Sequence, residues 1–472
     1  MIESLGIILF TYLIISIYRY LTLMQKEHYI AGTCSKFKVR WLIHIYYFVP
    51  IFSKSFRPKF TNRFIRLTLA VLSLNTILVI FIGFIVNPIF SIALCIVTQF
   101  LLIDFTALIM RPIEGKFSNK FVKRAQTKLE KISPVVVGIT GSYGKTSTKN
   151  HLKELLLGKR QVVATPASWN NRGGISRAVN EYLDEGTEIF IAEMGMYKKG
   201  EIANLVKWVK PSISIITAIG NAHLERIGSV ENILQAKAEI TQTANTVVLW
   251  VSDERLDDLS KNLGEKKIIR CGYKGKPQLE VEVSKDGNEI LFSDKDHNEI
   301  AKIPTTNGLH EGNIACALGA VIALGIPLDK LQEKLLNLTT PEHRATVGKS
   351  EQGYVVIDNT FNSNLEGAKS NIAKLSSEVK SGNRYVVTPG LVELGEAQNR
   401  SNYELGKEIA KSGATLIVTH FINRSSLING AQNVDGKVKS FANRQIAVDW
   451  VRKNLQEIDG VLYENDLPVY YP

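Results

Sequence analysis

The sequence predicts an α/β protein that is preceded by membrane-spanning helices, and three observations lead to this fold class. The first 110 residues contain three apolar runs. A glycine-rich loop at Gly138–Ser147 lies between a valine-rich stretch and a helix-like stretch. From there to the C-terminus, short apolar runs alternate with helical patterns, which is typical of a parallel sheet covered by helices. A length of 472 residues also suggests about three structural units.

Residues 1–110 are expected to form a transmembrane region with about three spans. The apolar runs are Leu5–Tyr18, Leu67–Val86 and Ile89–Met110. The last two are long enough to cross about 30 Å of hydrocarbon, and Asn87-Pro88 leaves room only for a tight turn between them. Positive charge follows the first run instead of preceding it, which favours an uncleaved anchor over a signal peptide. The aromatic run Trp41–Phe52 is too short to cross and suits an interfacial helix.

The net positive charge of the chain comes entirely from the part next to these runs. Residues 1–131 carry 17 Lys or Arg and 5 Asp or Glu, a net charge of +12, whereas the remainder carries 40 of each sign. This distribution argues against a nucleic-acid partner and for contact with anionic membrane lipids. Basic residues at 19–66 and 111–131 place both segments in the cytoplasm, so we expect a multi-pass cell-membrane protein whose C-terminal part is cytoplasmic. Residues 111–131 are predicted to form a basic linker helix.

Two further features of the sequence are Asp104, which lies within the third apolar run, and the four cysteines. An acid within an apolar span is costly and often functional, but we favour the interpretation that Asp104 faces water or another helix near one end of its span. The four cysteines are scattered with no CxxC pair, which fits a reducing compartment and predicts no zinc site.

The stretch GITGSYGKTS, Gly138–Ser147, is predicted to be a phosphate-binding loop. Its glycines let backbone N–H groups converge on phosphate oxygens, Lys145 supplies positive charge, and the Thr146 hydroxyl can bind Mg²⁺. The pattern is G-x-x-G-x-x-G-K-T-S and not a strict Walker A motif, because Ile139 occupies the position of that motif's first glycine. The expected nucleotide contacts in this loop are Gly141, Ser142, Gly144, Lys145, Thr146 and Ser147.

Two later apolar stretches end in residues that suit a metal ion. Ile189–Glu193 ends in a carboxylate, and Ser212–Gly220 leads to His223. Ligands of open α/β sheets bind at the carboxyl ends of the strands, so we expect Glu193 and His223 near the phosphate-binding loop. Together they suggest Mg²⁺ or Mn²⁺ held against a nucleotide.

Five separated motifs resemble the Mur ligase family, and most of all the branch that adds D-alanyl-D-alanine to the muramoyl tripeptide. They include the loop, TPASWNNRGGIS, EMGMYKKGEI and NAHLERIGSVENILQAKAEI, and the resemblance extends from about Ser133 to the C-terminus. The resemblance implies an ATP-dependent acid–amino-acid ligase. Such an enzyme activates an acceptor carboxylate as an acyl-phosphate, which the amine of an amino acid or dipeptide then attacks.

The resemblance also assigns roles to single residues. Lys237 in AKAEI matches a lysine that family members carry as a carbamate, an anion able to hold a second Mg²⁺. Asn313, Arg344 and Asp358 match nucleotide contacts. The implied catalytic residues are Lys145, His223 and Lys237; the implied metal ligands are Thr146, Glu193, His223 and Lys237; the expected substrate contacts are Asn170, Asn171, Asn362 and Asn364.

The sequence departs from the family pattern in three places. Cys316 replaces a second Asn after Asn313, and Pro389–Gly395 replaces a Gly-Asp-Met-like turn, which leaves the nucleotide contact and the amino-acid specificity open. The usual UDP-sugar-binding domain is absent, and membrane spans stand in its place. We therefore expect an acceptor presented at the membrane, such as a lipid-linked cell-wall or capsule precursor, because tethering raises effective concentration.

The soluble part is expected to have two domains. Residues 132–338 would form the central ATP-binding domain, with a small antiparallel insert at Gln278–Ile303, and 339–472 a second, Rossmann-like unit. Two other functions stay open: a membrane-bound polyglutamate-type polymer synthase, and a membrane NTPase that drives transport or regulation. A catalytically dead scaffold is disfavoured because all the expected site residues are present.

Overall fold

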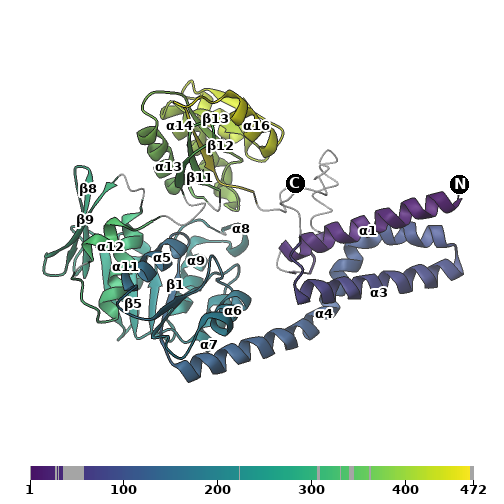
Figure 1. The fold of residues 1–472 in the computed structure, drawn as a ribbon, viewed down its shortest axis with the longest axis horizontal. Coiled ribbons are helices and arrows are strands. Elements are labelled where there is room, and N and C mark those ends of the chain that lie inside the picture. Colours follow the sequence, from purple (N-terminus) through teal and green to yellow (C-terminus); the bar gives the residue numbers. More distant parts are fainter. Residues whose placement is uncertain are drawn as a thin grey trace. The chain divides into compact units, whose positions relative to one another are not determined.

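The computed structural model describes residues 2–26, 29, 31–35, 58–222, 224–305, 309–329, 331–339, 345–360 and 363–467. It divides into two compact units, Met1–Phe121 and Val122–Asp466, and each has its own hydrophobic core (Figure 1). The expected interfacial helix Trp41–Phe52 lies outside the described residues.

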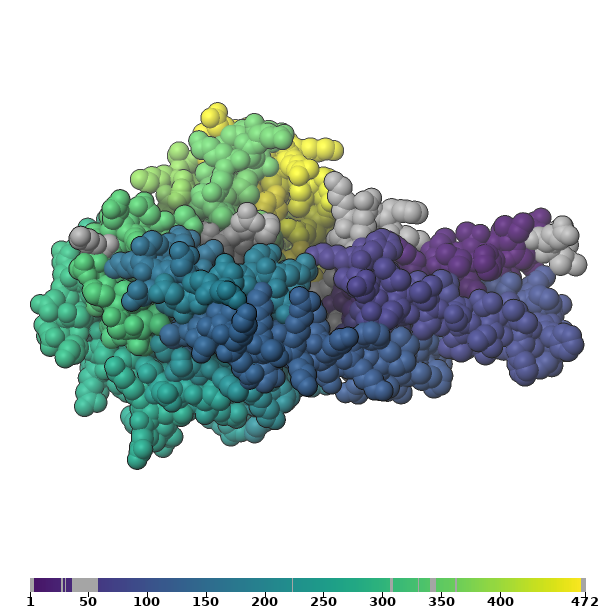
Figure 2. Space-filling model, turned by 60° about the horizontal axis from the view of Figure 1, so that its bottom comes forward, coloured from purple at the N-terminus to yellow at the C-terminus, as the bar shows by residue number. Residues whose placement is uncertain are grey.

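The first unit is helical, as its apolar runs predict. Its long helices are α1 (Ile2–Lys26), α3 (Asn62–Ile85) and α4 (Pro88–Ile132). Each is long and apolar enough to cross a membrane. Apolar side chains such as those of Leu21, Val71 and Ile103 are buried in the core of this unit. Other large apolar side chains are exposed on its surface. Figure 2 shows the helices of this unit in purple and blue-violet as a surface of side chains. The exposed large apolar residues of α3 include Phe81 and Phe84. Apolar side chains on the outside of a helical unit are what a lipid-facing surface requires.

The third span and the basic linker helix are one continuous helix. α4 runs for 45 residues from Pro88 to Ile132, with Pro112 inside it. A proline removes one backbone hydrogen bond but need not end a helix that neighbouring turns support. Arg66 of α3 forms two hydrogen bonds to the Glu114 carboxylate, at 2.6 and 2.7 Å, and so joins α3 to the turn of α4 that follows this proline.

Asp104 has a structural role in the first unit. Its carboxylate accepts hydrogen bonds from the backbone N–H of Cys34 (3.2 Å) and of Ser35 (2.8 Å), and from the Ser35 hydroxyl (2.6 Å). These bonds satisfy backbone donors that would otherwise be unpaired at the start of the short turn at residues 33–35. The interpretation that this acid faces another part of the protein is therefore the one the contacts support.

The second unit contains a nine-stranded sheet in the order β2-β3-β1-β4-β5-β6-β7-β8-β9. From β2 to β7 neighbouring strands pair in parallel. Its strands are β1 (Val135–Thr140), β2 (Val162–Ala164), β3 (Ile189–Glu193), β4 (Ile213–Ile216), β5 (Thr246–Trp250), β6 (Lys267–Tyr273), β7 (Val281–Asp286), β8 (Glu289–Asp294) and β9 (Glu299–Pro304). Its helices are α5 (Lys145–Leu156), α6 (Arg172–Tyr182), α7 (Glu201–Val209), α8 (Leu224–Ile227), α9 (Val230–Ala238), α10 (Glu254–Lys261), α11 (Glu311–Ala323) and α12 (Gln332–Leu336).

The parallel strands are continuous apolar runs because helices cover both faces of the sheet. In β3 all five residues are buried, and in β1 all but the first. Helix α11 is rich in Ala and Gly, and this lets it pack closely: a Cβ at Gly319 would lie 2.7 Å from the Cys271 sulfur of β6. The central strands β1, β3 and β4 consequently have fixed carboxyl ends, which is where the candidate site lies.

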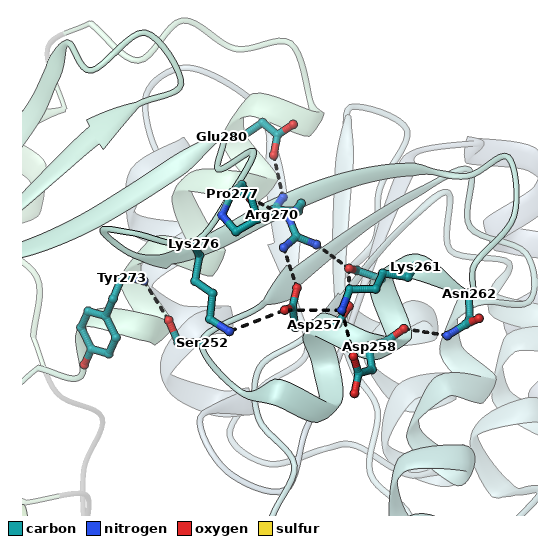
Figure 3. A network of polar contacts seen from close by, with 11 residues as sticks. Ser252, Asp257, Asp258, Lys261, Asn262, Arg270, Tyr273, Lys276, Pro277 and Glu280 are labelled. Atoms are coloured by element: carbon teal, nitrogen blue, oxygen red, sulfur yellow. Dashed lines mark hydrogen bonds and ion pairs between the residues drawn. The ribbon is translucent and has the colours of Figure 1, made fainter.

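The sheet becomes antiparallel at its far edge, as the sequence of the insert predicts. β7 pairs with β8 and β8 with β9 in antiparallel register. A polar network beside β6 secures this transition (Figure 3). There, Arg270 donates to the carboxylate of Asp257 in α10 at 2.5 Å and to the carbonyl of Pro277 at 3.2 Å, and Lys276 lies 3.5 Å from the same carboxylate. The network ties α10 to the turn that leads into β7, away from the candidate site.

The C-terminal part of the second unit has a six-stranded sheet in the order β10-β11-β15-β12-β13-β14. Only the β10–β11 pair is antiparallel. Its elements are β10 (Thr346–Lys349), β11 (Val355–Asn359), β12 (Arg384–Thr388), β13 (Thr415–Val418), β14 (Val438–Ser440), β15 (Gly460–Glu464), α13 (Leu365–Glu378), α14 (Gln398–Lys411), α15 (Arg424–Gln432) and α16 (Arg444–Asn454). This is the α/β unit that the sequence predicts.

Glu464 ends the central strand β15 and is fully buried. Its carboxylate accepts hydrogen bonds from the side-chain amides of Asn359 (2.8 Å) and Asn371 (2.9 Å), and from the Ser363 hydroxyl. Burial raises the pKa of Glu464 from 4.5 to about 7, although the three hydrogen bonds oppose this shift.

All four cysteines are buried free thiols. Cys34 and Cys95 belong to the first unit, and Cys271 and Cys316 face each other between β6 and α11.

Candidate active site

The predicted phosphate-binding loop connects β1 to α5. Gly141 and Gly144 adopt positive φ angles of 155° and 80°. A Cβ at Gly141 would lie 2.0 Å from the Thr217 hydroxyl, and one at Gly144 would lie 2.1 Å from Oδ1 of Asn313. Only glycine fits both positions, and this allows backbone N–H groups at the start of α5 to face one ligand.

The loop is supported by the neighbouring strand and turn. The Ser142 N–H donates to the carbonyl of Ala218 (2.8 Å), and the Ser142 hydroxyl receives the N–H of Gly220 (3.0 Å). The Lys145 ammonium group donates to the carbonyl of Gly141 at 2.7 Å, so it lies over the loop. Ser147, the third residue of α5, is half-buried. The predicted loop residues therefore come together in one turn at the carboxyl end of β1.

Glu193 lies beside this loop, as expected. β3 pairs with β1 so that Glu193 is level with Ile139. The Thr146 hydroxyl donates to Glu193 Oε2 at 2.9 Å, and both residues are buried. Burial alone would raise the pKa of Glu193, but Lys149, Lys145 and the amide of Asn170 together hold it below its ordinary value. The carboxylate is therefore charged at neutral pH and lies next to the Thr146 hydroxyl.

Asn170 and Asn171 follow the expected substrate motif but have different positions. The Asn170 side-chain amide donates to Glu193 Oε1 at 3.0 Å. Asn171 caps α6, because its Oδ1 accepts the N–H of Gly174 at 2.9 Å. The sequence predicted both as substrate contacts, and the structure gives each an internal hydrogen bond.

Lys237 is in α9 and only 2 % of its surface is exposed. Burial lowers the pKa of its amine well below the ordinary value, and the nearby charge of Lys145 lowers it further. A lower pKa increases the share of the neutral amine, which is the form that reacts with CO₂ to give a carbamate.

Asn313 and the expected residues of the C-terminal part complete the set. Asn313 lies in the first turn of α11 and its side chain faces Gly144 of the loop. Asp358 is in β11, and its carboxylate accepts the N–H (3.1 Å) and the hydroxyl (2.7 Å) of Thr360. Asn364 caps α13 through a hydrogen bond from the N–H of Gly367 at 2.9 Å. Three expected site residues lie outside the described residues: His223, Arg344 and Asn362.

The residues around Thr146 fit a magnesium ion that is shared with phosphate oxygens. Mg²⁺ prefers oxygen ligands and is usually held by one or two carboxylates together with substrate phosphates and water. Thr146 and Glu193 supply a hydroxyl and a carboxylate next to the loop that would bind those phosphates. Among the described residues there is no group of three or more His, Cys, Asp and Glu side chains that would hold a metal without a nucleotide.

Lys149 was not among the site residues expected from the sequence. This residue is 1 % exposed, and its ammonium group lies 3.1 Å from Glu193 Oε2. A signal was present, because Lys149 follows Lys145 by four positions and Thr146 by three, and residues at these spacings share one face of a helix. A lysine on the helix face that points toward the Glu193 carboxylate is not a solvated helix lysine.

Comparison with known proteins supports the resemblance. Residues 139–324 match the Mur ligase middle domain. A relative in Bacillus subtilis, UDP-N-acetylmuramoyl-tripeptide–D-alanyl-D-alanine ligase, is 26% identical over 344 residues, which are 72% of this chain and 75% of that protein. The enzyme of the same name from Synechocystis is 26% identical over 334 residues, 70% of this chain and 71% of the relative.

Solved structures give the same result for the fold. The MurF ligase of Thermotoga maritima in complex with ADP superposes with a TM-score of 0.61 at 26% identity, over 75% of this chain and 81% of that chain. MurF from Acinetobacter baumannii superposes with a TM-score of 0.63 at 20% identity, over 75% of this chain and 78% of the other. The predicted α/β fold and the resemblance to Mur ligases are confirmed.

Proposed function

We propose that this chain is an ATP-dependent ligase of the Mur type that joins an amino acid or dipeptide to an acceptor carboxylate presented at a membrane. The observation that carries the proposal is the contact of the Thr146 hydroxyl with Glu193 beside a glycine loop that ends in Lys145. This arrangement provides hydrogen-bond donors, a cation and hard oxygen ligands where a nucleotide triphosphate would lie.

The roles that we propose are those that the resemblance to Mur ligases implies. The loop amides and Lys145 bind phosphate oxygens and neutralise negative charge. Thr146, Glu193, His223 and Lys237, the last as a carbamate, hold Mg²⁺. When bound, Mg²⁺ supplies further positive charge for the transfer of phosphate to the acceptor carboxylate. Asn313, Arg344 and Asp358 contact the nucleotide, and Asn170, Asn171, Asn362 and Asn364 bind the acceptor or the incoming amine.

We propose the same division of labour along the chain as the sequence predicts. Residues 1–110 anchor the protein, and 111–131 link the anchor to the soluble part. Residues 132–338 form the central ATP-binding domain, and 339–472 form a Rossmann-like domain that adds nucleotide contacts and the segment for the incoming amine. The three apolar helices and the +12 charge of residues 1–131 support a multi-pass membrane protein with its ligase domains in the cytoplasm. An acceptor linked to a membrane lipid suits such an anchor, because both reactants then share the same surface.

The direct test compares two acceptors. Purified full-length protein in lipid nanodiscs would receive ATP, Mg²⁺ and D-alanyl-D-alanine or single amino acids, with a muramoyl peptide linked either to a polyprenyl lipid or to UDP. We expect amine-dependent phosphate release and a product of the added mass on the lipid-linked acceptor. Turnover on the UDP-linked acceptor alone would refute the membrane-presented acceptor, and repeated mass increments would identify a polymer synthase.

A matched pair of variants tests the phosphate-binding loop. Lys145→Ala removes the cation over the loop and is expected to abolish amine-dependent phosphate release. Lys153→Ala, two turns along the same helix and half-buried, is expected to keep the activity of the wild type. Equal turnover of the two variants would show that the loop does not bind the nucleotide.

A further inference from the structure

Lys149 is among the largest fully buried side chains of the described residues. It lies in the second turn of α5, and its ammonium group contacts partners on two different segments. One is the Oε2 atom of Glu193, at 3.1 Å, and the other is the backbone carbonyl of Ala167. The side chain thus joins the helix that follows the phosphate-binding loop to the end of β3 and to the segment Thr165–Asn171, which we name the 165–171 loop.

The 165–171 loop is attached to Glu193 at three points. Asn170 donates to Oε1 of this carboxylate at 3.0 Å, and the N–H of Glu193 donates to the Thr165 hydroxyl at 3.1 Å. The third is indirect and passes through Lys149 to Ala167. Both carboxylate oxygens are therefore engaged: Oε1 by the loop, and Oε2 by Thr146 and Lys149 of α5.

Ala167 has an unusual backbone conformation for this contact. Its φ angle is +42°, in the left-handed region that a residue with a Cβ seldom adopts, and its side chain is exposed. Such a conformation costs about 1 kcal/mol or more, and it persists where surrounding contacts hold it. The contact between the Ala167 carbonyl and the buried ammonium group is one that fixes this turn of the loop.

A buried ion pair is a poor means of adding stability, because desolvation of the two charges offsets most of their attraction. A methionine or leucine at position 149 would fill the same space without that cost. What the ammonium group adds is a directed link between a carboxylate and a carbonyl that an apolar side chain cannot form.

We infer that Lys149 is a positioning residue that couples the Glu193 carboxylate to the 165–171 loop. Binding of Mg²⁺ and nucleotide at Thr146 and Glu193 then reduces the motion of this loop, which carries the expected substrate contacts Asn170 and Asn171. The inference rests on the proposed nucleotide site and adds a connection from that site to the acceptor side. Its physical basis is a continuous set of contacts from Thr146 through Glu193 and Lys149 to Ala167.

Hydrogen exchange measured by mass spectrometry tests this coupling without any acceptor substrate. Full-length protein in nanodiscs would be compared with and without Mg²⁺ and ADP, and peptides that cover 138–148 and 165–171 would be followed. In the wild type we expect Mg²⁺ and ADP to slow exchange in both peptides, by about tenfold in the 165–171 loop. In Lys149→Met the 138–148 peptide should still be protected, whereas protection of the 165–171 loop should fall to less than about twofold.

Two further variants complete the design. Lys153→Met, on the same helix, is the matched control and should behave as the wild type. Asn170→Ser removes the link from the Asn170 amide to Glu193 at a half-buried position and should reduce loop protection in part, which keeps the inference testable if Lys149→Met does not fold.

The outcomes separate the inference from the proposed function. No protection of 138–148 in the wild type would refute the nucleotide site itself. Protection of 138–148 together with full loop protection in Lys149→Met, or in Asn170→Ser if only that variant folds, would overturn the coupling and leave the nucleotide site intact.

Discussion

The replacement Glu464→Gln should change how the stability of the C-terminal sheet depends on pH. Glu464 is fully buried and its pKa is raised from 4.5 to about 7. An acid whose pKa is raised on folding stabilises the fold in full below its unfolded pKa, and this contribution is lost as the pH rises through the folded pKa. The wild type should therefore lose stability between pH 5 and pH 8 for a reason that the glutamine variant lacks.

The size of the effect follows from the two pKa values. Ionisation of Glu464 costs the folded chain about 1 kcal/mol at pH 5 and about 3 kcal/mol at pH 8, a difference of roughly 2–3 kcal/mol. For a domain of this size that corresponds to a change of roughly 5–10 °C in the melting midpoint. Glutamine keeps the shape of the side chain but places an amide donor opposite the donors of Asn359, Asn371 and Ser363, which adds an offset that does not vary with pH.

The assay is thermal unfolding of both proteins in the same detergent at several values between pH 5 and pH 8. Hydrogen exchange of β15 peptides, corrected for the intrinsic pH dependence, would assign the transition to this sheet. We expect the melting midpoint of the variant, minus that of the wild type, to increase as the pH rises. A difference between the two midpoints that stays constant from pH 5 to pH 8 would refute the reasoning.

Three further substitutions address other parts of the molecule. Gly144→Ala places a Cβ 2.1 Å from the Asn313 side chain at a φ of +80°, and should weaken ADP binding by about tenfold or more in calorimetry; unchanged affinity would contradict the loop geometry. Lys237→Ala should lose ligase activity that added bicarbonate does not restore, and a fully active variant would remove the carbamate. Asp104→Leu leaves the backbone donors of Cys34 and Ser35 unpaired at about 1–3 kcal/mol each, and should lower the melting midpoint without changing ADP affinity; an unchanged midpoint would show that these contacts contribute nothing.

Local patterns in the sequence were sufficient for much of the fold. The glycine spacing of 138–147 depends on backbone conformations that few other residues adopt, so the turn between β1 and α5 could be predicted from the loop alone. Glu193 could be placed next to this turn because parallel strands bring their carboxyl ends to one edge. The antiparallel insert was expected from a strand-rich stretch with Asp286-Gly287 as its turn signal, and in the structure Gly287 and Asn288 form the turn between β7 and β8.

Contacts between distant segments could not be predicted in the same way. Nothing in the neighbourhood of Lys149 shows that it meets Ala167, because the link depends on how α5 and the 165–171 loop pack. Asn171 and Asn364 were expected to contact substrate, and in the structure their side-chain oxygens cap helices, a use that the same residue type serves equally well. The third apolar run and the linker helix were expected as separate elements that meet at residues 110 and 111, whereas α4 continues through both, with Pro112 inside it.

The burial of all four thiols has a practical consequence for experiments on this protein. Maleimides and spin labels react with exposed thiolates, and burial both blocks access to Cys271 and raises its pKa. A cysteine introduced at one exposed position, such as Phe121 in α4, would accordingly be more reactive than the four buried native thiols. A second introduced cysteine in the second unit would then allow its distance to the helical first unit to be measured during turnover, with no need to replace a native cysteine.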